Sequence, residues 1–242
     1  MLLPEGVGAT SPAPPPAQAP PPKHSAPVIP PNIRWAVQYL EDQGHALSFA
    51  TKKPVDRDGK PLPWYTYPAI EYLQGIDWST KRVLEFGSGH SSLFWAGRVA
   101  RIWSVESDES WHADISPQIP SNATLDLRRE KEDYIHYAQE VGGAFDLIIV
   151  DGVHRLDCVK NCLPALAEDG LLIFDNSDWH PQSTQRLREA GLIQMDFTGL
   201  GPINQYAWTT SLFPRPQFRP RPLQERLPLW GVGALQQFAN PG

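Results

Sequence analysis

The amino-acid sequence predicts an α/β fold: a Rossmann-like, seven-stranded, mostly parallel sheet with helices on both faces and a terminal antiparallel hairpin. Two observations predict it. Short continuous apolar runs alternate with helical patterns between residues 82 and 190, which is typical of parallel sheets covered on both faces. The last two apolar runs, 192–197 and 206–213, follow each other without a helix, so we expect them to pair antiparallel at one end of the sheet.

Two helices are expected before the sheet begins. Asn32 can cap a helix whose apolar residues recur at helical spacing and which ends near Gly44. A polar stretch with turn signals, residues 55–59, follows it. Pro68 suits the first turn of the second helix.

Strands and connecting helices then alternate regularly. The strands are short and mostly apolar, and we expect them at 82–86, 102–105, 124–127, 145–150 and 171–174. The helices between and after them are expected around 93–95 and at 111–115, 131–141, 156–166 and 181–190.

The two ends of the chain are rich in proline, which numbers 26 in 242 residues. Residues 1–31 are predicted to be a disordered arm, either a solvated leader or a proline-rich ligand for a partner. Residues 32–213 form the predicted domain, and 214–242 a tail that runs over its surface. Because no apolar run suits a signal peptide or a membrane helix, we expect a cytoplasmic protein that does not associate with membranes.

Charge and cysteine content narrow the class of protein. A net charge of −6 argues against a protein whose main task is to hold nucleic acid. Cys158 and Cys162 lie four residues apart in a predicted helix, a geometry that does not favour a disulfide. We expect both to be thiols in the core.

Polar residues gather where the predicted strands end. In an open α/β sheet, ligands bind outside the carboxyl ends of the strands. Those ends carry Gly87-Ser88-Gly89, Glu106, the segment 151–154 and the pair Asp175-Asn176. The glycine turn lets a ligand approach the backbone, and an acid about twenty residues later can accept hydrogen bonds from ribose hydroxyls. The sequence therefore predicts a nucleoside-bearing cofactor.

Glu85 bears on which cofactor this is. It lies inside the first predicted strand, where a dinucleotide-binding fold normally has an apolar residue. The stretch from Val83 to Ser91, an acid-x-Gly-x-Gly pattern, resembles the first motif of class I S-adenosylmethionine-dependent methyltransferases. The terminal hairpin fits that family as well. The resemblance implies S-adenosylmethionine as cofactor, bound by residues at the strand ends and after the third strand: Glu85, Gly87, Ser88, Gly89, Glu106, Asp133 and Asp151.

The fourth and fifth strand ends resemble those of the metal-dependent O-methyltransferases. That resemblance implies Mg²⁺ held by Asp151, Asp175 and Asn176, which carry the hard oxygen ligands that this ion prefers. The alternative is that Asp151 orients a loop and the other two make a turn. His154 is the candidate general base, together with Asp151, or else a hydrogen-bonded loop residue.

Two further segments have two interpretations each. By the resemblance, the aromatic stretch 64–67 either covers the cofactor or packs in the core. The loop 199–204 contains glycines and Asn204 and is a candidate substrate-facing loop. The sequence thus predicts methyl transfer to a hydroxyl of a small molecule or saccharide. An NAD-type oxidoreductase or epimerase, or a catalytically silent methyltransferase-like binding module, is the alternative.

Overall fold

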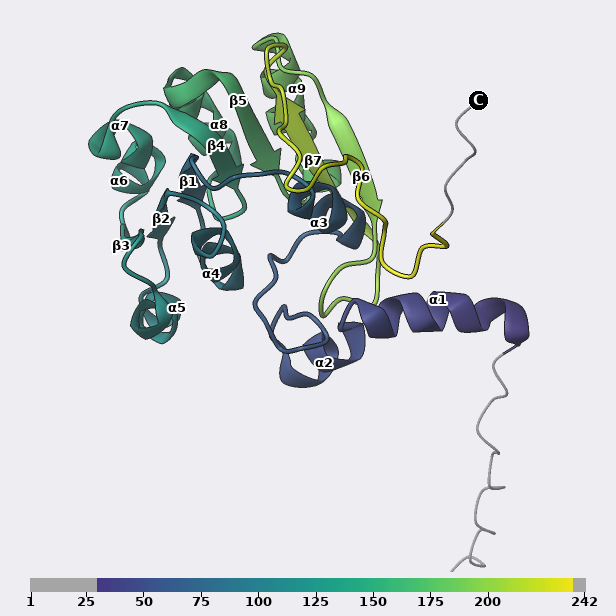
Figure 1. Cartoon of the computed structure of the whole chain (residues 1–242). Helices are drawn as coiled ribbons and strands as arrows, with labels where there is room; N and C mark the ends of the chain where they lie inside the picture. The colour runs from purple at the N-terminus through teal and green to yellow at the C-terminus, as the bar shows by residue number, and fades with distance from the viewer. Residues whose placement is uncertain (1–29, 237–242) are drawn as a thin grey trace, which may run out of the picture.

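Seven strands form one twisted sheet in the order β3-β2-β1-β4-β5-β7-β6 in the computed structural model, which describes residues 30–236 (Figure 1). Strands β1 to β5 run parallel, and β7 is antiparallel to both β5 and β6. The predicted fold class is confirmed. The strands are β1 (Arg82–Phe86), β2 (Arg101–Glu106), β3 (Ala123–Leu127), β4 (Phe145–Val150), β5 (Leu166–Phe174), β6 (Met195–Gly199) and β7 (Trp208–Pro214).

Helices connect the parallel strands and precede the sheet. The α-helices are α1 (Pro31–Asp42), α2 (His45–Thr51), α3 (Tyr67–Gln74), α4 (His90–Ala96), α5 (Glu109–Ile115), α6 (Lys131–Ile135), α7 (Tyr137–Val141), α8 (Arg155–Cys162) and α9 (Pro181–Glu189). Short 3₁₀ turns are η1 (Ser116–Gln118), η2 (Leu163–Ala165) and η3 (Ser177–Trp179). In Figure 1, α1 and α2 lie below the sheet, apart from the helices that cover it.

The alternation of side chains along the strands divides the core into two layers. On one face, Phe86, Ile148 and Phe174 pack with residues of α6, α7, α8 and α9. On the other face, Val83 and Ile149 pack with residues of α3 and α4. Because both faces are buried, the strands need continuous apolar runs, which is why their positions could be predicted.

Several details differ from the sequence prediction. Asn32, the predicted cap of the first helix, lies within α1, whose cap position is Pro30. The helix α2 was not predicted. The expected helix 131–141 is divided at His136 into α6 and α7. Strand β5 begins at Leu166, where we expected a helix to end, because the chain returns to the sheet directly after η2.

The structure describes both thiols but only part of each end of the chain. The predicted arm lies outside the described residues except for its last two. The described part of the tail contacts the end of α3, where the amide of Leu223 donates to the carbonyl of Gly75. Cys158 and Cys162 are free and buried, as expected. Within residues 30–236, no helix is both long and apolar enough to cross a membrane.

Candidate active site

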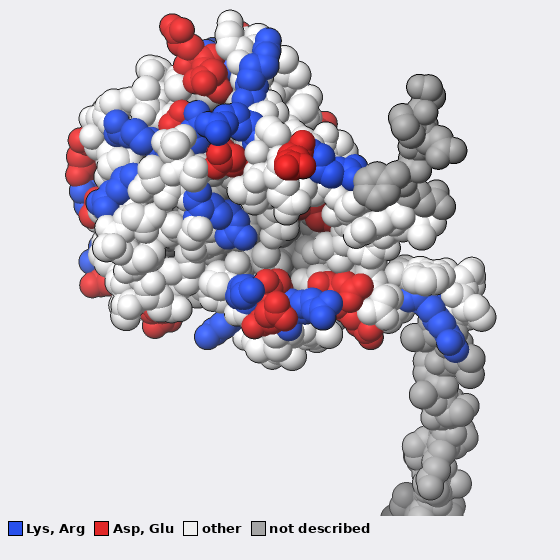
Figure 2. Space-filling view, viewed as in Figure 1, with Lys and Arg blue, Asp and Glu red and all other residues white. Residues whose placement is uncertain are grey.

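A cavity of about 420 Å³ opens at the carboxyl ends of the strands. The glycine turn after β1 and the loops after β4 and β5 form part of its wall. The segment 52–64, which joins α2 to α3, and the loop between β6 and β7 form the rest. In Figure 2 the surface is hollowed between the main body and the part below it. The parallel topology therefore gathers the predicted polar residues around one space.

The glycine turn is shaped by a close approach of two loops. Gly87 has φ +93°, and a Cβ there would lie 2.9 Å from the amide nitrogen of Gly152. At position 87, a residue with a Cβ would collide with the loop after β4 and would also be disfavoured at this positive φ. Only glycine therefore allows the loops after β1 and β4 to pack this closely. Ser88 and Gly89 follow and line the cavity. The loop after β4 thus packs against one side of the glycine turn, and the other side faces the cavity, where a ligand can approach it.

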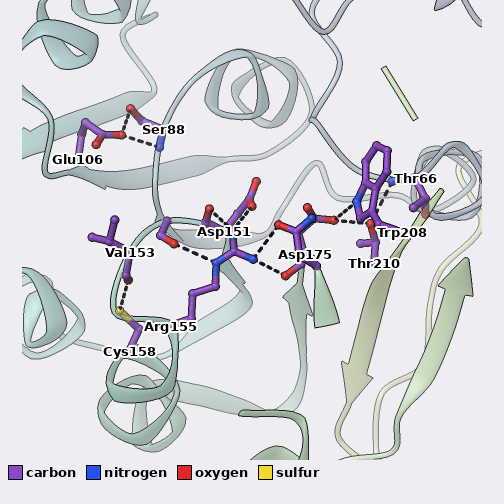
Figure 3. A network of polar contacts seen from close by, with 12 residues as sticks. Thr66, Ser88, Glu106, Asp151, Val153, Arg155, Cys158, Asp175, Trp208 and Thr210 are labelled. Atoms are coloured by element: carbon purple, nitrogen blue, oxygen red, sulfur yellow. Dashed lines mark hydrogen bonds and ion pairs between the residues drawn. The ribbon is translucent and has the colours of Figure 1, made fainter. Parts of the chain in front are cut away.

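Glu106, at the end of β2, holds the glycine turn. Its Oε2 accepts hydrogen bonds from the amide and the hydroxyl of Ser88, at 3.1 and 3.0 Å (Figure 3). Its Oε1 accepts from the amides of Ser107 and Asp108, at 2.7 and 2.9 Å. Four donors therefore fill the four lone-pair positions of this carboxylate. Glu106 lies behind Ser88, outside the set of residues that line the cavity.

Glu85 is 1% exposed and lies beneath the turn. Its Oε2 accepts from the hydroxyls of Ser92 and Ser104, while its Oε1 is buried without a hydrogen-bond partner. Burial, partly offset by these hydroxyls, raises the pKa of Glu85 to about 7. Ser92 in turn accepts from the amide of Gly89, at 3.1 Å. The buried acid is therefore coupled to the glycine turn through one serine.

Arg155 joins the loops after β4 and β5, and its role was not predicted from the sequence. Its Nη2 donates to the carbonyl and to Oδ1 of Asp151, at 2.9 and 3.1 Å (Figure 3). Its Nη1 donates to the carbonyl of Asp175 and to Oδ1 of Asn176, and its Nε to the carbonyl of Gly152. All five N–H donors of the guanidinium are thus used.

The two strand-end acids differ in their surroundings. Asp175 is buried, and its Oδ1 accepts from Nε1 of Trp208 at 3.0 Å and from the hydroxyl of Thr210. Burial, and next the charge of Asp151, raise the pKa of Asp175 well above its ordinary value. The side chain of Asp151 is 22% exposed. Burial raises its pKa to about 6, and Arg155 opposes this rise.

These residues do not fit the predicted Mg²⁺ site. The guanidinium of Arg155 already binds Oδ1 of Asp151 and Oδ1 of Asn176, two of the oxygens that a metal would need. Oδ1 of Asp175 is turned to the β7 residue Trp208. Across residues 30–236 no three His, Cys, Asp or Glu side chains are grouped so as to hold a metal. No chemistry is therefore assigned to a metal here.

Five predicted site residues lie outside the cavity wall: Glu85, Gly87 and Glu106, described above, and also His154 and Asp133. His154 is exposed, has φ +52° and stands at the start of α8, where its ring contacts Tyr134 edge-on. Asp133 is exposed in the first turn of α6, where an acid suits the helix dipole. This geometry gives no support to a base at His154 or an adenine contact at Asp133.

Aromatic residues form a part of the wall that sequence reasoning only partly found. In the stretch 64–67, Tyr65 and Tyr67 are buried in the core, as the packing interpretation expects, whereas Trp64 is exposed and lines the cavity. That Trp64 covers a cofactor stays a prediction. Asn204 lines the cavity, as expected for a substrate-facing loop. The wall also contains four aromatic residues that were not predicted: Trp111, Trp179, Tyr206 and Trp208.

No protein-family model matches this chain, and no curated protein matches its sequence. Among solved structures, the chain is similar to precorrin-6y C5,15-methyltransferase from Geobacter metallireducens GS-15, with 11% identity, 60% of this chain and 86% of that chain covered, and a TM-score of 0.49. It is also similar to the N-methyltransferase NodS from Bradyrhizobium japonicum WM9 (16%, 60% and 90%, 0.46). Spermidine synthase from Thermotoga maritima is a third (16%, 63% and 57%, 0.47). Identities this low describe a likeness of fold, so the chemistry must come from the site itself.

Proposed function

We propose that this chain is an S-adenosylmethionine-dependent methyltransferase that methylates a hydroxyl oxygen of a small molecule or sugar. The observation that carries the proposal is the pairing of the glycine turn with Glu106 at the neighbouring strand end. The acid holds Ser88 by two hydrogen bonds, at the edge of a cavity into which the glycine turn opens. A nucleoside binds at such a turn in folds of this kind.

The residues around the turn fit that cofactor. When bound, S-adenosylmethionine supplies a methyl group whose carbon bonds to the acceptor oxygen while its bond to sulfur breaks, with the electron pair going to sulfur. Glu106 would accept the ribose hydroxyls, and the hydroxyl of Ser88, which can rotate, would give up its place on Oε2. Ser88 and Gly89 provide the backbone that the cofactor would lie against. Glu85 fixes that backbone through Ser92.

Asp151 is the residue placed to accept the acceptor's proton. It lines the cavity, and Arg155 holds its Oδ1 while its Oδ2 has no partner among the described residues. A carboxyl with a pKa of about 6 is mostly ionised at neutral pH and is a stronger base than an ordinary aspartate. We assign the general-base role to Oδ2 of Asp151. His154 does not reach the cavity and has no role in this mechanism.

Calorimetric titration of the whole chain with S-adenosylhomocysteine tests the cofactor class. We expect binding in the micromolar range, and none to NAD⁺ at the same concentrations. Binding of NAD⁺ alone would move the chain to the oxidoreductases, since that class shares the glycine turn and the distant acid. Binding of neither ligand would favour a silent binding module.

A further inference from the structure

Exposed aromatic side chains are concentrated at the cavity. Among the described residues, six Trp, Tyr or Phe side chains are exposed: Trp35, Phe49, Trp64, Trp111, Trp179 and Tyr206. The last four of these line the cavity. Exposed aromatic surface is unfavourable in water relative to burial, so a ligand that covers it gains affinity. In a monomer, such a concentration at one site indicates binding rather than packing.

Trp111, on α5, packs against the glycine turn. Its Nε1 donates to the carbonyl of Ser88 at 2.8 Å, and its ring lies over Gly89, where a Cβ would come within 3.3 Å of it. This places Trp111 on the cofactor side of the cavity. Trp64, Trp179 and Tyr206 have no such contact with the turn and remain for the acceptor.

Three of the rings form a continuous row. Trp179 lies 6.4 Å from Tyr206, with their planes 35° apart, and Tyr206 lies 6.1 Å from Trp208, with their planes 62° apart. Trp208 is 1% exposed and is fixed by its hydrogen bond to Asp175 at the tip of β5. The row therefore runs from the open mouth of the cavity to the strand ends, where Asp151 also lies.

Most polar side chains near the row of aromatic rings already form hydrogen bonds within the protein. Asp151 and Asn176 bind Arg155, and Asp175 binds Trp208 and Thr210. The side-chain atoms on the strand-end side that have no hydrogen-bond partner among the described residues are Oδ2 of Asp151, Oδ2 of Asp175, Nδ2 of Asn176 and the amide of Asn204. A sugar carries hydroxyls around its whole ring and needs donors and acceptors on several sides, whereas the rest of this wall is aromatic. A planar ring with one polar edge fits such a wall better.

We propose an acceptor subsite for a planar aromatic ring, formed by the row of Trp179, Tyr206 and Trp208 together with Trp64. This proposal rests on the proposed methyl transfer. The ring's face lies against the aromatic side chains, and its edge carries the atom to be methylated toward Asp151. Stacking contributes affinity beyond burial because the positive edge of one ring attracts the negative face of another.

The test uses two probes with the same carbon skeleton. The whole chain, saturated with S-adenosylhomocysteine, is titrated with 2-naphthol, with decahydro-2-naphthol and with methyl β-D-glucopyranoside, and ligand-observed NMR measures each affinity. We expect 2-naphthol to bind at least about fivefold more tightly than its saturated counterpart, as stacking predicts. Equal affinities, or a preference for the glucoside, would overturn the subsite. Failure of S-adenosylhomocysteine to bind would overturn the proposed function instead, since the titration with S-adenosylhomocysteine comes first.

Single-residue variants test whether these aromatic side chains form the subsite. Trp179→Ala and Tyr206→Ala should each weaken 2-naphthol binding about tenfold, because each loses a stacked ring at the cavity mouth. Both side chains are more than half exposed, at 55% and 52%, so the fold should tolerate the changes. Trp35→Ala is the matched control, since Trp35 is exposed on α1 and away from the cavity. If the control weakens binding as much as the two variants do, or if they bind as the unaltered chain does, the subsite is wrong.

Discussion

Nη2 of Arg155 lies 3.1 Å from Oδ1 of Asp151, and the same guanidinium reaches the loop after the neighbouring strand. One side chain at the start of α8 thus joins the carboxyl ends of β4 and β5. The positive charge beside Asp151 is supplied by the side chain of Arg155. The position of Asp151, the candidate base, is therefore fixed by the protein itself and needs no bound ion.

Arg155→Lys should destabilise the protein by about 2–4 kcal/mol. A lysine has one ammonium group and cannot supply five N–H donors in a fixed plane, so buried carbonyls and the carboxylate of Asp151 lose partners. Urea denaturation followed by tryptophan fluorescence measures the free energy of unfolding. Arg186→Lys is the control, because Arg186 is exposed on α9. An equal effect of the two changes would show that the network contributes little.

Chelation should leave the protein unchanged. Because Arg155 binds the oxygens of Asp151 and Asn176, we expect EDTA to alter neither the thermal midpoint nor the affinity for S-adenosylhomocysteine. Added Mg²⁺ should likewise have no effect on either quantity. A rise of several degrees in the midpoint with millimolar Mg²⁺, reversed by EDTA, would contradict this geometry and restore the metal hypothesis.

Glu106→Ala should weaken binding of S-adenosylhomocysteine about 10- to 100-fold. The change removes the carboxylate proposed to accept the ribose hydroxyls, and hydrogen bonds to a charged group contribute about 1.5–3 kcal/mol. It also releases the turn at Ser88, so the thermal midpoint should be measured beside the affinity. Glu109→Ala, at an exposed acid in the first turn of α5, is the control. Unchanged affinity in folded Glu106→Ala would remove the ribose assignment.

The strand ends could be predicted because a parallel sheet brings all carboxyl ends to one edge. The apolar runs locate those ends to within a residue or two, so Glu106, Asp151 and Asp175 follow from the sequence. The hydrogen-bond partners of these acids could not be predicted from the sequence. Trp208 reaches Asp175 only because β7 inserts beside β5, and this pairing joins segments more than thirty residues apart.

Arg155 and the exposed residue Trp179 were missed for a related reason. The spacing of four residues between Asp151 and Arg155 was visible, but the other acceptors of the guanidinium come from the loop after β5. Hydrophobic patterning assigns a tryptophan to the core, and exposure of Trp179 depends on how η3 meets the loop before β7. Such relationships arise from the packing of elements and leave no local pattern in the sequence.

The pH dependence of stability should contain a contribution from Glu85. Its pKa is about 7 in the folded protein against an ordinary 4.5, so the folded state holds this proton more tightly. The contribution is complete below about pH 4.5 and is lost as the pH rises through 7. The free energy of unfolding should therefore fall by about 3 kcal/mol across that window relative to Glu85→Gln, which has no proton to lose.

Glu85→Gln isolates this effect and tests the role of the buried acid. Above pH 7 the variant should be more stable than the unaltered protein, because no buried charge with an unpartnered oxygen remains. If Glu85 supports the cofactor loop through Ser92, the same variant should bind S-adenosylhomocysteine less tightly. Parallel stability curves for the two proteins from pH 4.5 to 8 would show that Glu85 titrates normally.

Gly87→Ala should destabilise the protein more than Gly142→Ala, and the comparison separates the effect of backbone conformation from that of close packing. Both glycines have positive φ, +93° and +72°, and Gly142 has ψ 164°, so the backbone conformation disfavours an alanine at either position. A Cβ at Gly142 meets no atom within 4 Å, whereas one at Gly87 meets the backbone of Gly152 at 2.9 Å. The loops after β1 and β4 must then separate, at a further cost of about 1–3 kcal/mol.

The same pair of variants also separates stability from binding. Because Gly87 is the first residue of the turn whose next two residues line the cavity, its replacement should also weaken S-adenosylhomocysteine binding, while Gly142→Ala should bind as the unaltered chain does. Urea denaturation and calorimetry measure the two quantities on the same samples. If both variants lose the same stability and keep full affinity, the contact between Gly87 and Gly152 does not shape the site, and the glycine turn is then a strand-to-helix connection without a binding role.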